Sequence, residues 1–127
     1  MKQDSKGFTL LEVMLALMVF SVVMAGMAPA FAAQMKRNTL SQIRTEASSA
    51  AEMYIDSQRL LDPGAIPKTG NSGSINYTIG TRTYQVVASY CLTAAYCTGP
   101  YNRHLTVNVS YRNQNVFSTE TVFTQLR

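Results

Sequence analysis

The sequence has few charged side chains and few of the residues that usually perform chemistry. Charged residues make up 14% of the 127 residues, against roughly 25% in typical soluble domains. The chain contains one histidine, His104, and no tryptophan. One histidine and few carboxylates supply neither a nucleophile with its base and orienting group nor a quartet of metal ligands. The composition therefore predicts no enzyme, no metal site and no cofactor.

The shortage of charge is concentrated in one apolar segment near the N-terminus. Between Phe8 and Ala33 the only ionisable side chain is Glu12. A bilayer span needs about 20 residues, and the frequent leucine, methionine and alanine favour a helix. Proline lacks a backbone N–H and clashes with the preceding turn, so we expect a bend or local melting near Gly26 and Pro29.

The next segment, residues 34–61, is polar but carries apolar residues at helical spacing. An interval of three, four or seven residues places them on one face of an α-helix. Asp62-Pro63-Gly64 is expected to end this helix. The predicted apolar stripe consists of Leu40, Ile43, Ala47, Ala50, Tyr54 and Leu61.

The C-terminal region, residues 62–127, alternates β-forming and polar residues between turns. Such alternation predicts strands, and short links predict an antiparallel meander. The expected strands are Ile75 to Ile79, Tyr84 to Leu92, His104 to Tyr111 and Val116 to Leu126. The meander should pack its apolar face on the helix stripe. The predicted fold is α+β, with a long N-terminal α-helix packed on a small antiparallel sheet.

Four segments therefore follow one another along the chain. They are a polar segment at residues 1–7, an apolar helix half at 8–33, an amphipathic helix half at 34–61 and the β region at 62–127. A cleaved secretory signal fits the basic start and the small residues near Ala30. However, Glu12 lies inside its apolar core, and that core is too long. A plain membrane anchor has no use for Glu12, because a carboxylate at a bilayer centre costs about 2.5–3.5 kcal/mol.

A third interpretation accounts for Gly7, Phe8 and Glu12 together. The run Gly7-Phe8-Thr9-Leu10-Leu11-Glu12 follows a short basic segment and opens the apolar helix. It resembles the class III leader of type IV prepilins and type II secretion pseudopilins. The resemblance implies that a prepilin peptidase cuts between Gly7 and Phe8 and that Phe8 becomes the N-methylated first residue. Pro29 also falls where many members have a helix-loosening proline, beside Gly26.

The resemblance further implies a structural subunit of a fibre. The Glu12 carboxylate of one subunit is expected to neutralise the Phe8 ammonium of its neighbour, since each charge is costly in lipid. Leu11 to Leu17, with Phe20, looks more like minor pilins and I-type pseudopilins than like major pilins. The expected location is the bacterial inner membrane, with the C-terminal region in the periplasm, and afterwards the pilus or pseudopilus. This orientation rests on the leader, because Lys36 and Arg37 leave the positive charges ambiguous.

Two cysteines, Cys91 and Cys97, are separated by five residues. In an oxidising periplasm a disulfide between them is expected, and two buried free thiols are the alternative. The tyrosines around this loop, Tyr90, Tyr96 and Tyr101, are either core residues or a surface that contacts another subunit or a ligand.

Other functions remain open at this stage. The chain could be a tip adhesin, the DNA receptor of an uptake pilus, a major pilin, or a lone anchored protein that never polymerises. The net charge of +4 permits DNA binding. From Gln34 onward the charges are scattered, with Lys36-Arg37 the only adjacent basic pair, which favours a solvated surface.

Overall fold

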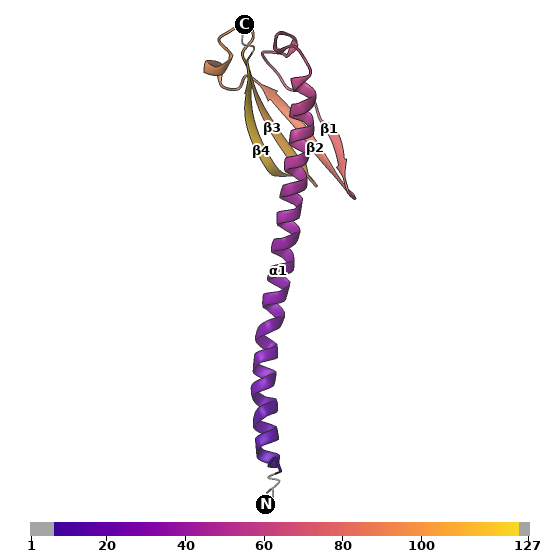
Figure 1. Ribbon diagram of the computed structural model, residues 1–127, viewed down its shortest axis with the longest axis vertical. Helices are drawn as coiled ribbons and strands as arrows, with labels where there is room; N and C mark the ends of the chain where they lie inside the picture. Colours follow the sequence, from indigo (N-terminus) through magenta and orange to yellow (C-terminus); the bar gives the residue numbers. More distant parts are fainter. Residues whose placement is uncertain (1–6, 125–127) are drawn as a thin grey trace, which may run out of the picture. The chain divides into compact units, whose positions relative to one another are not determined.

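The computed structural model describes residues 7–124, and Figure 1 shows its helix and sheet. Most of the predicted leader, residues 1–6, and the end of the last predicted strand lie outside the described residues. The elements are α1 (Leu10–Arg59), η1 (Pro63–Ala65), β1 (Ile75–Ile79), β2 (Arg82–Tyr90), η2 (Ala94–Cys97), β3 (Arg103–Tyr111) and β4 (Gln114–Phe123). The predicted α+β class is confirmed.

The chain divides into two compact units between Leu40 and Ser41. We call the second unit, from Ser41 onward, the head. The first unit is helical from Leu10, and its apolar side chains are exposed throughout. Its backbone remains α-helical through Gly26 and Pro29. The structure thus shows no local melting at these two residues, and helix loosening there stays a prediction.

Helix α1 ends at Arg59, two residues before the predicted end. The residue before a proline avoids helical backbone angles, so the Asp62-Pro63 pair forces the chain to turn. The Asp62 side chain then accepts a 2.8 Å hydrogen bond from the Gly64 N–H and begins the short helix η1. The stop signal was read correctly, but the helix ended earlier than the apolar spacing suggested.

The sheet is a four-stranded antiparallel meander in the order β1-β2-β3-β4. Gly80, at φ +61°, opens the turn between β1 and β2. Arg112 and Asn113 both have positive φ, at 50° and 61°, and form the two-residue turn between β3 and β4. Two positive φ angles in succession characterise the type I′ turn, whose twist matches that of the flanking strands. The predicted strand order and pairing are confirmed.

The core of the head lies between one face of the sheet and α1. Small residues of α1, Ala47, Ala50 and Ala51, are fully buried and let the helix approach the strands closely. The buried apolar residues of the sheet are Tyr84, Val86, Ala88, Tyr90, Leu105, Val107 and Val109. They alternate along β2 and β3, as expected for one face of a sheet.

The predicted helix stripe was correct at its centre and wrong at both ends. Ala47, Ala50 and Tyr54 are buried, whereas Leu40 is 45% exposed and Leu61 is 48% exposed. Leu61 follows the end of α1 and so no longer shares a face with the stripe. Ala51 and Ile55, which the spacing did not include, widen the buried face instead. A core-facing helix usually buries such a broader stripe.

Candidate functional site

The first candidate site is the start of α1. Thr9 precedes the helix, and its Oγ1 accepts a 3.3 Å hydrogen bond from the Glu12 N–H. The Thr9 carbonyl accepts further bonds from the N–H groups of Glu12, at 3.1 Å, and Val13, at 3.2 Å. A threonine followed three residues later by glutamate is a typical helix-start sequence. Thr9 therefore fixes where the helix begins.

The predicted cleavage position lies immediately before this cap. Gly7 and Phe8 are exposed and outside the helix. Among residues 7–124, no other side chain or distant backbone atom lies within 4 Å of where a Cβ on Gly7 would be. A peptidase needs an uncovered peptide bond, and the exposure of Gly7 and Phe8 meets this requirement within the described residues. The cleavage itself stays a prediction.

Glu12 and Phe8 line the same surface hollow. Its other lining residues are apolar, namely Val13, Ala16, Leu17 and Phe20. Among the described residues the Glu12 carboxylate has no hydrogen-bond or ion-pair partner. An anion beside an exposed apolar hollow is suited to receive a cation from outside the chain. The attraction between the two charges offsets part of the solvation energy that each loses.

The surrounding helix has the length and composition of a membrane span. Within residues 7–124, α1 is the one helix apolar enough to cross a membrane, and its most apolar stretch has no buried residue. Leu10, Leu11 and Met18 are more than 70% exposed. Such a surface needs lipid or other helices around it. Gly26 and Pro29 lie on this helix outside the hollow at Glu12.

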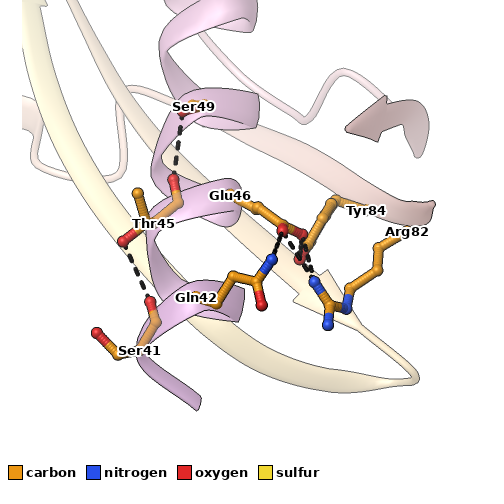
Figure 2. A network of polar contacts seen from close by, with 7 residues as sticks. All are labelled: Ser41, Gln42, Thr45, Glu46, Ser49, Arg82 and Tyr84. Carbon is orange, nitrogen blue, oxygen red and sulfur yellow. Dashed lines mark hydrogen bonds and ion pairs between the residues drawn. The ribbon is translucent and has the colours of Figure 1, made fainter. Parts of the chain in front are cut away.

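A second candidate site is a polar network between α1 and the sheet, shown in Figure 2. Glu46 accepts bonds at 2.8 and 3.0 Å from Arg82 Nη1, through its two carboxylate oxygens. The Tyr84 hydroxyl donates a 2.6 Å bond to Glu46 Oε2, and Gln42 Nε2 donates a 2.9 Å bond to Oε1. Four hydrogen bonds therefore converge on one carboxylate and tie the helix to β2.

The network changes the acidity of its members. The Tyr84 hydrogen bond, supported by Arg82, holds the pKa of Glu46 below its usual 4.5. Burial, together with the bond to Glu46, raises the pKa of Tyr84 from 10.0 to about 12. The hydrogen bond to Glu46 likewise raises the pKa of Arg82. The network therefore keeps one anion, one cation and a neutral phenol at neutral pH, which is a structural arrangement rather than a catalytic one.

Sequence reasoning missed this network, although two signals were present. Arg82 shares the alternation of Tyr84 and Val86, so it points to the buried face of β2. Glu46 precedes Ala47 and lies three residues after Ile43, at the edge of the helix stripe. A basic and an acidic residue at the edges of two apolar faces that pack together suggest an ion pair.

Arg103 is a second buried charge that the sequence did not reveal. It is 4% exposed and donates from Nε to the Ile66 carbonyl at 2.8 Å. Its Nη1 donates to the Asn102 carbonyl at 2.9 Å, and its Nη2 to the Gly64 carbonyl at 3.5 Å. Arg103 thus fastens the loop after α1 to the start of β3.

The cysteine loop closes the same end of the sheet. Cys91 and Cys97 form the predicted disulfide. The Cys91 N–H donates to the His104 carbonyl at 2.7 Å, and the His104 N–H donates to Cys97 Sγ at 3.2 Å. The two cysteines of the loop therefore continue the hydrogen bonding to β3 beyond the end of β2.

The sole histidine is buried below this loop. The Tyr96 ring lies 5.4 Å from the His104 ring, between centroids, and Glu120 Oε2 is 3.4 Å from His104 Nε2. Within the described residues neither ring nitrogen has a hydrogen-bond partner. The described part of the chain has no group of three or more metal-ligating side chains, around His104 or elsewhere.

The three tyrosines near the cysteines do not form one surface. The Tyr90 hydroxyl is buried 3.1 Å from that of Tyr54, so Tyr90 is a core residue. Burial and this contact raise the pKa of Tyr54. Tyr96 is 53% exposed, and Tyr101 lies against Gly64. Only Tyr96 presents most of its ring to solvent.

Comparison with known proteins adds one finding at the N-terminus. Residues 2–28 match the model of the prokaryotic N-terminal methylation motif. Gly7, Phe8 and Glu12 lie inside this match. No curated protein and no solved structure matches the chain.

Proposed function

We propose that the chain, whose residues 2–28 match the N-terminal methylation motif, is a type IV pilin or pseudopilin and, within that family, a minor subunit that assembles into, or primes, a type IV pilus or a type II secretion pseudopilus. The family is one of structural subunits. We propose the same for this chain and assign it no catalytic role.

The observation that carries the proposal is the pairing of Phe8 and Glu12 in one apolar hollow at the start of a membrane-length helix. Cleavage after Gly7 would turn the Phe8 amide into an amine, which is a cation once protonated. The carboxylate of Glu12 would then accept the amine of a neighbouring subunit. Within lipid, this contact favours one axial register between subunits, and the apolar helices then pack together.

The assignment to a minor subunit rests on the sequence around Glu12 and on the small head. Leu11 to Leu17, with Phe20, is similar to minor pilins and I-type pseudopilins. The head has one four-stranded sheet. The proposed partners are the prepilin peptidase, other pilin or pseudopilin subunits and the inner membrane, with the head in the periplasm before assembly.

The first experiment is the intact mass and N-terminal sequence of the protein purified from membranes of its native host. A chain that starts at N-methyl-Phe8 supports the proposal. A start at Met1 contradicts it and leaves a simple anchor. A start near Phe31 or Ala33 also contradicts it, because the assembly helix would have been removed.

A second experiment separates assembly from anchoring. Glu12→Ala is expected to be cleaved and inserted normally but to be absent from sheared fibres or pseudopili. Glu52→Ala is the matched control, since Glu52 is an exposed carboxylate in the head part of the same helix. Normal incorporation of the Glu12→Ala subunit would overturn the assembly role.

A further inference from the structure

The two edge strands of the sheet differ in length, and the last strand offers the longer edge for pairing with another strand. β1 and β4 form the two edges, as Figure 1 shows, and no described strand pairs with the outer side of either. β4 has 10 residues and β1 has 5. Five of the ten side chains of β4 are exposed and none is fully buried by the described residues.

β4 has little of the protection that sheet edges usually carry. Its register shift against β3, between Val109 and Ser110, lies near the start of the strand and before Phe117. Proteins usually guard an edge with lysine, proline or a very short strand, because its free N–H and C=O groups accept a further strand. The sequence of β4, QNVFSTETVF, contains no lysine, arginine or proline, and Glu120 is its only charge. Most of its residues are β-branched or aromatic, which favours an extended strand.

The apolar residues at both edges are incompletely covered. On the helix side of the sheet, Phe117 and Phe123 of β4 are half-buried. Tyr77 and Ile79 of β1 are half-buried on the same side, and Ile75 is 37% exposed. A strand added to either edge would cover these side chains further, provided that its own apolar residues fell on the same face.

Strand direction selects the partner. In a four-stranded antiparallel meander the first and last strands run in opposite directions. Copies of the chain inserted in one membrane by the same N-terminal helix have the same polarity. Side by side, β4 of one copy is then antiparallel to β1 of the next, whereas two β4 strands would be parallel. Antiparallel pairing is the more stable of the two.

We propose that β4 pairs edge to edge with β1 of a second copy of this chain. This rests on the proposed function, because shared membrane insertion is what aligns the two heads. Two registers keep the apolar faces together, with Tyr77 opposite either Thr119 or Thr121. The contact uses different surfaces on the two copies, so it is heterologous. A pair of copies is sufficient, which is compatible with a subunit of low abundance.

Cysteine cross-linking tests the proposal on the full-length chain in membranes. Thr78 and Ser118 are exposed, point to the solvent side of their strands and face one another in the first register. In the second register Thr78 faces Glu120. Residues opposite one another in an antiparallel pair have Cβ atoms about 4.5–5.5 Å apart, close enough for a disulfide after a small adjustment. The native cysteines are already paired with each other.

The experiment therefore co-expresses two differently tagged chains and oxidises them. One chain carries Thr78→Cys, and the other carries Ser118→Cys or Glu120→Cys. The expected result is a mixed dimer with one of these two combinations. Gln85→Cys replaces Thr78→Cys as the control, because Gln85 is equally exposed but lies on the central strand β2. Its dimer yield should be several-fold lower.

Three results would overturn the proposal. They are no mixed dimer from either combination, equal yield with Gln85→Cys, or dimers formed only between two chains that carry Ser118→Cys. Mass spectrometry of the same sample reports the N-terminus. A processed chain without the cross-link overturns the strand pairing and leaves the proposed function standing. A cross-linked chain that still begins at Met1 overturns the proposed function and leaves the strand pairing standing.

Discussion

The Tyr84 hydroxyl donates a 2.6 Å hydrogen bond to the Glu46 carboxylate, which also receives Arg82 and Gln42. This contact joins residues 38 positions apart and sets how β2 lies on the helix. This hydrogen bond lowers the pKa of Glu46 and raises the pKa of Tyr84. The head is therefore expected to lose stability at both ends of the pH scale, for separate reasons.

At acid pH, Glu46 is the sensitive group. Its pKa in the folded head lies below 4.5, its usual value. As the pH falls below 4.5, the unfolded chain binds a proton that the folded chain does not, so the free energy of unfolding decreases. The contribution is fully present above that pH. We expect Glu46→Gln to lower the melting temperature at pH 7 and to reduce the difference from wild type at pH 3.

All seven tyrosines lie at position 54 or later. The tyrosine band in near-ultraviolet circular dichroism of the full chain in detergent therefore follows the head alone. Glu52→Gln is the control, since this exposed carboxylate has no hydrogen-bond partner among the described residues. An equal pH dependence in the Glu46→Gln and wild-type proteins would contradict the assignment.

At alkaline pH, Tyr84 and Tyr54 are the sensitive groups. The pKa of Tyr84 rises to about 12 and that of Tyr54 rises as well, both chiefly through burial. From pH 10 to pH 12 the unfolded chain releases phenolic protons that the folded chain retains, so the free energy of unfolding falls. Tyrosinate absorbance should rise in two steps, with the second step coinciding with unfolding. A single step near pH 10 with the head still folded would contradict this.

Replacing Arg103 tests the anchor of the loop after α1. Arg103→Met keeps most of the buried volume but leaves the Ile66 carbonyl without its donor. An unpaired buried acceptor costs about 1–3 kcal/mol, so the melting temperature should fall. Arg44→Met, at an exposed position of the helix, should leave it unchanged. Unchanged stability of Arg103→Met would show that solvent replaces the lost hydrogen bonds.

The disulfide should contribute modestly to the free energy of unfolding, because it closes a short loop. With Cys91 and Cys97 six positions apart, the chain-entropy contribution is about 2 kcal/mol. We expect the double variant Cys91→Ser/Cys97→Ser to lose about this much, measured by denaturant unfolding. A reductant should destabilise the wild-type head similarly and leave the double variant unaffected. A reductant effect on the variant would indicate another cause.

Local patterns predicted most of the fold. The alternation at Leu105, Val107 and Val109 and the turn after Tyr111 both matched the structure, because period and turn chemistry are encoded within a few residues. The end of α1 was misplaced because apolar spacing continued to Leu61 after Pro63 had already constrained the backbone.

The candidate site divides in the same way. Gly7, Phe8 and Glu12 were found from the sequence because they are neighbours in the chain. The Glu46–Arg82 pair and the Arg103–Ile66 bond join residues 36 and 37 positions apart. Neither contact follows from a local pattern. Both depend on how the helix and sheet pack, which propensity and spacing do not specify.

The hydroxyl that begins α1 belongs to Thr9, on the retained side of the proposed cut. Removal of the leader therefore takes away none of the hydrogen bonds that Thr9 makes to the first turn. Maturation would then add a charge to the end of a helix that is already formed, without any refolding. On this view a precursor waiting in the membrane is kept from assembling by a missing charge, while its helix is ready.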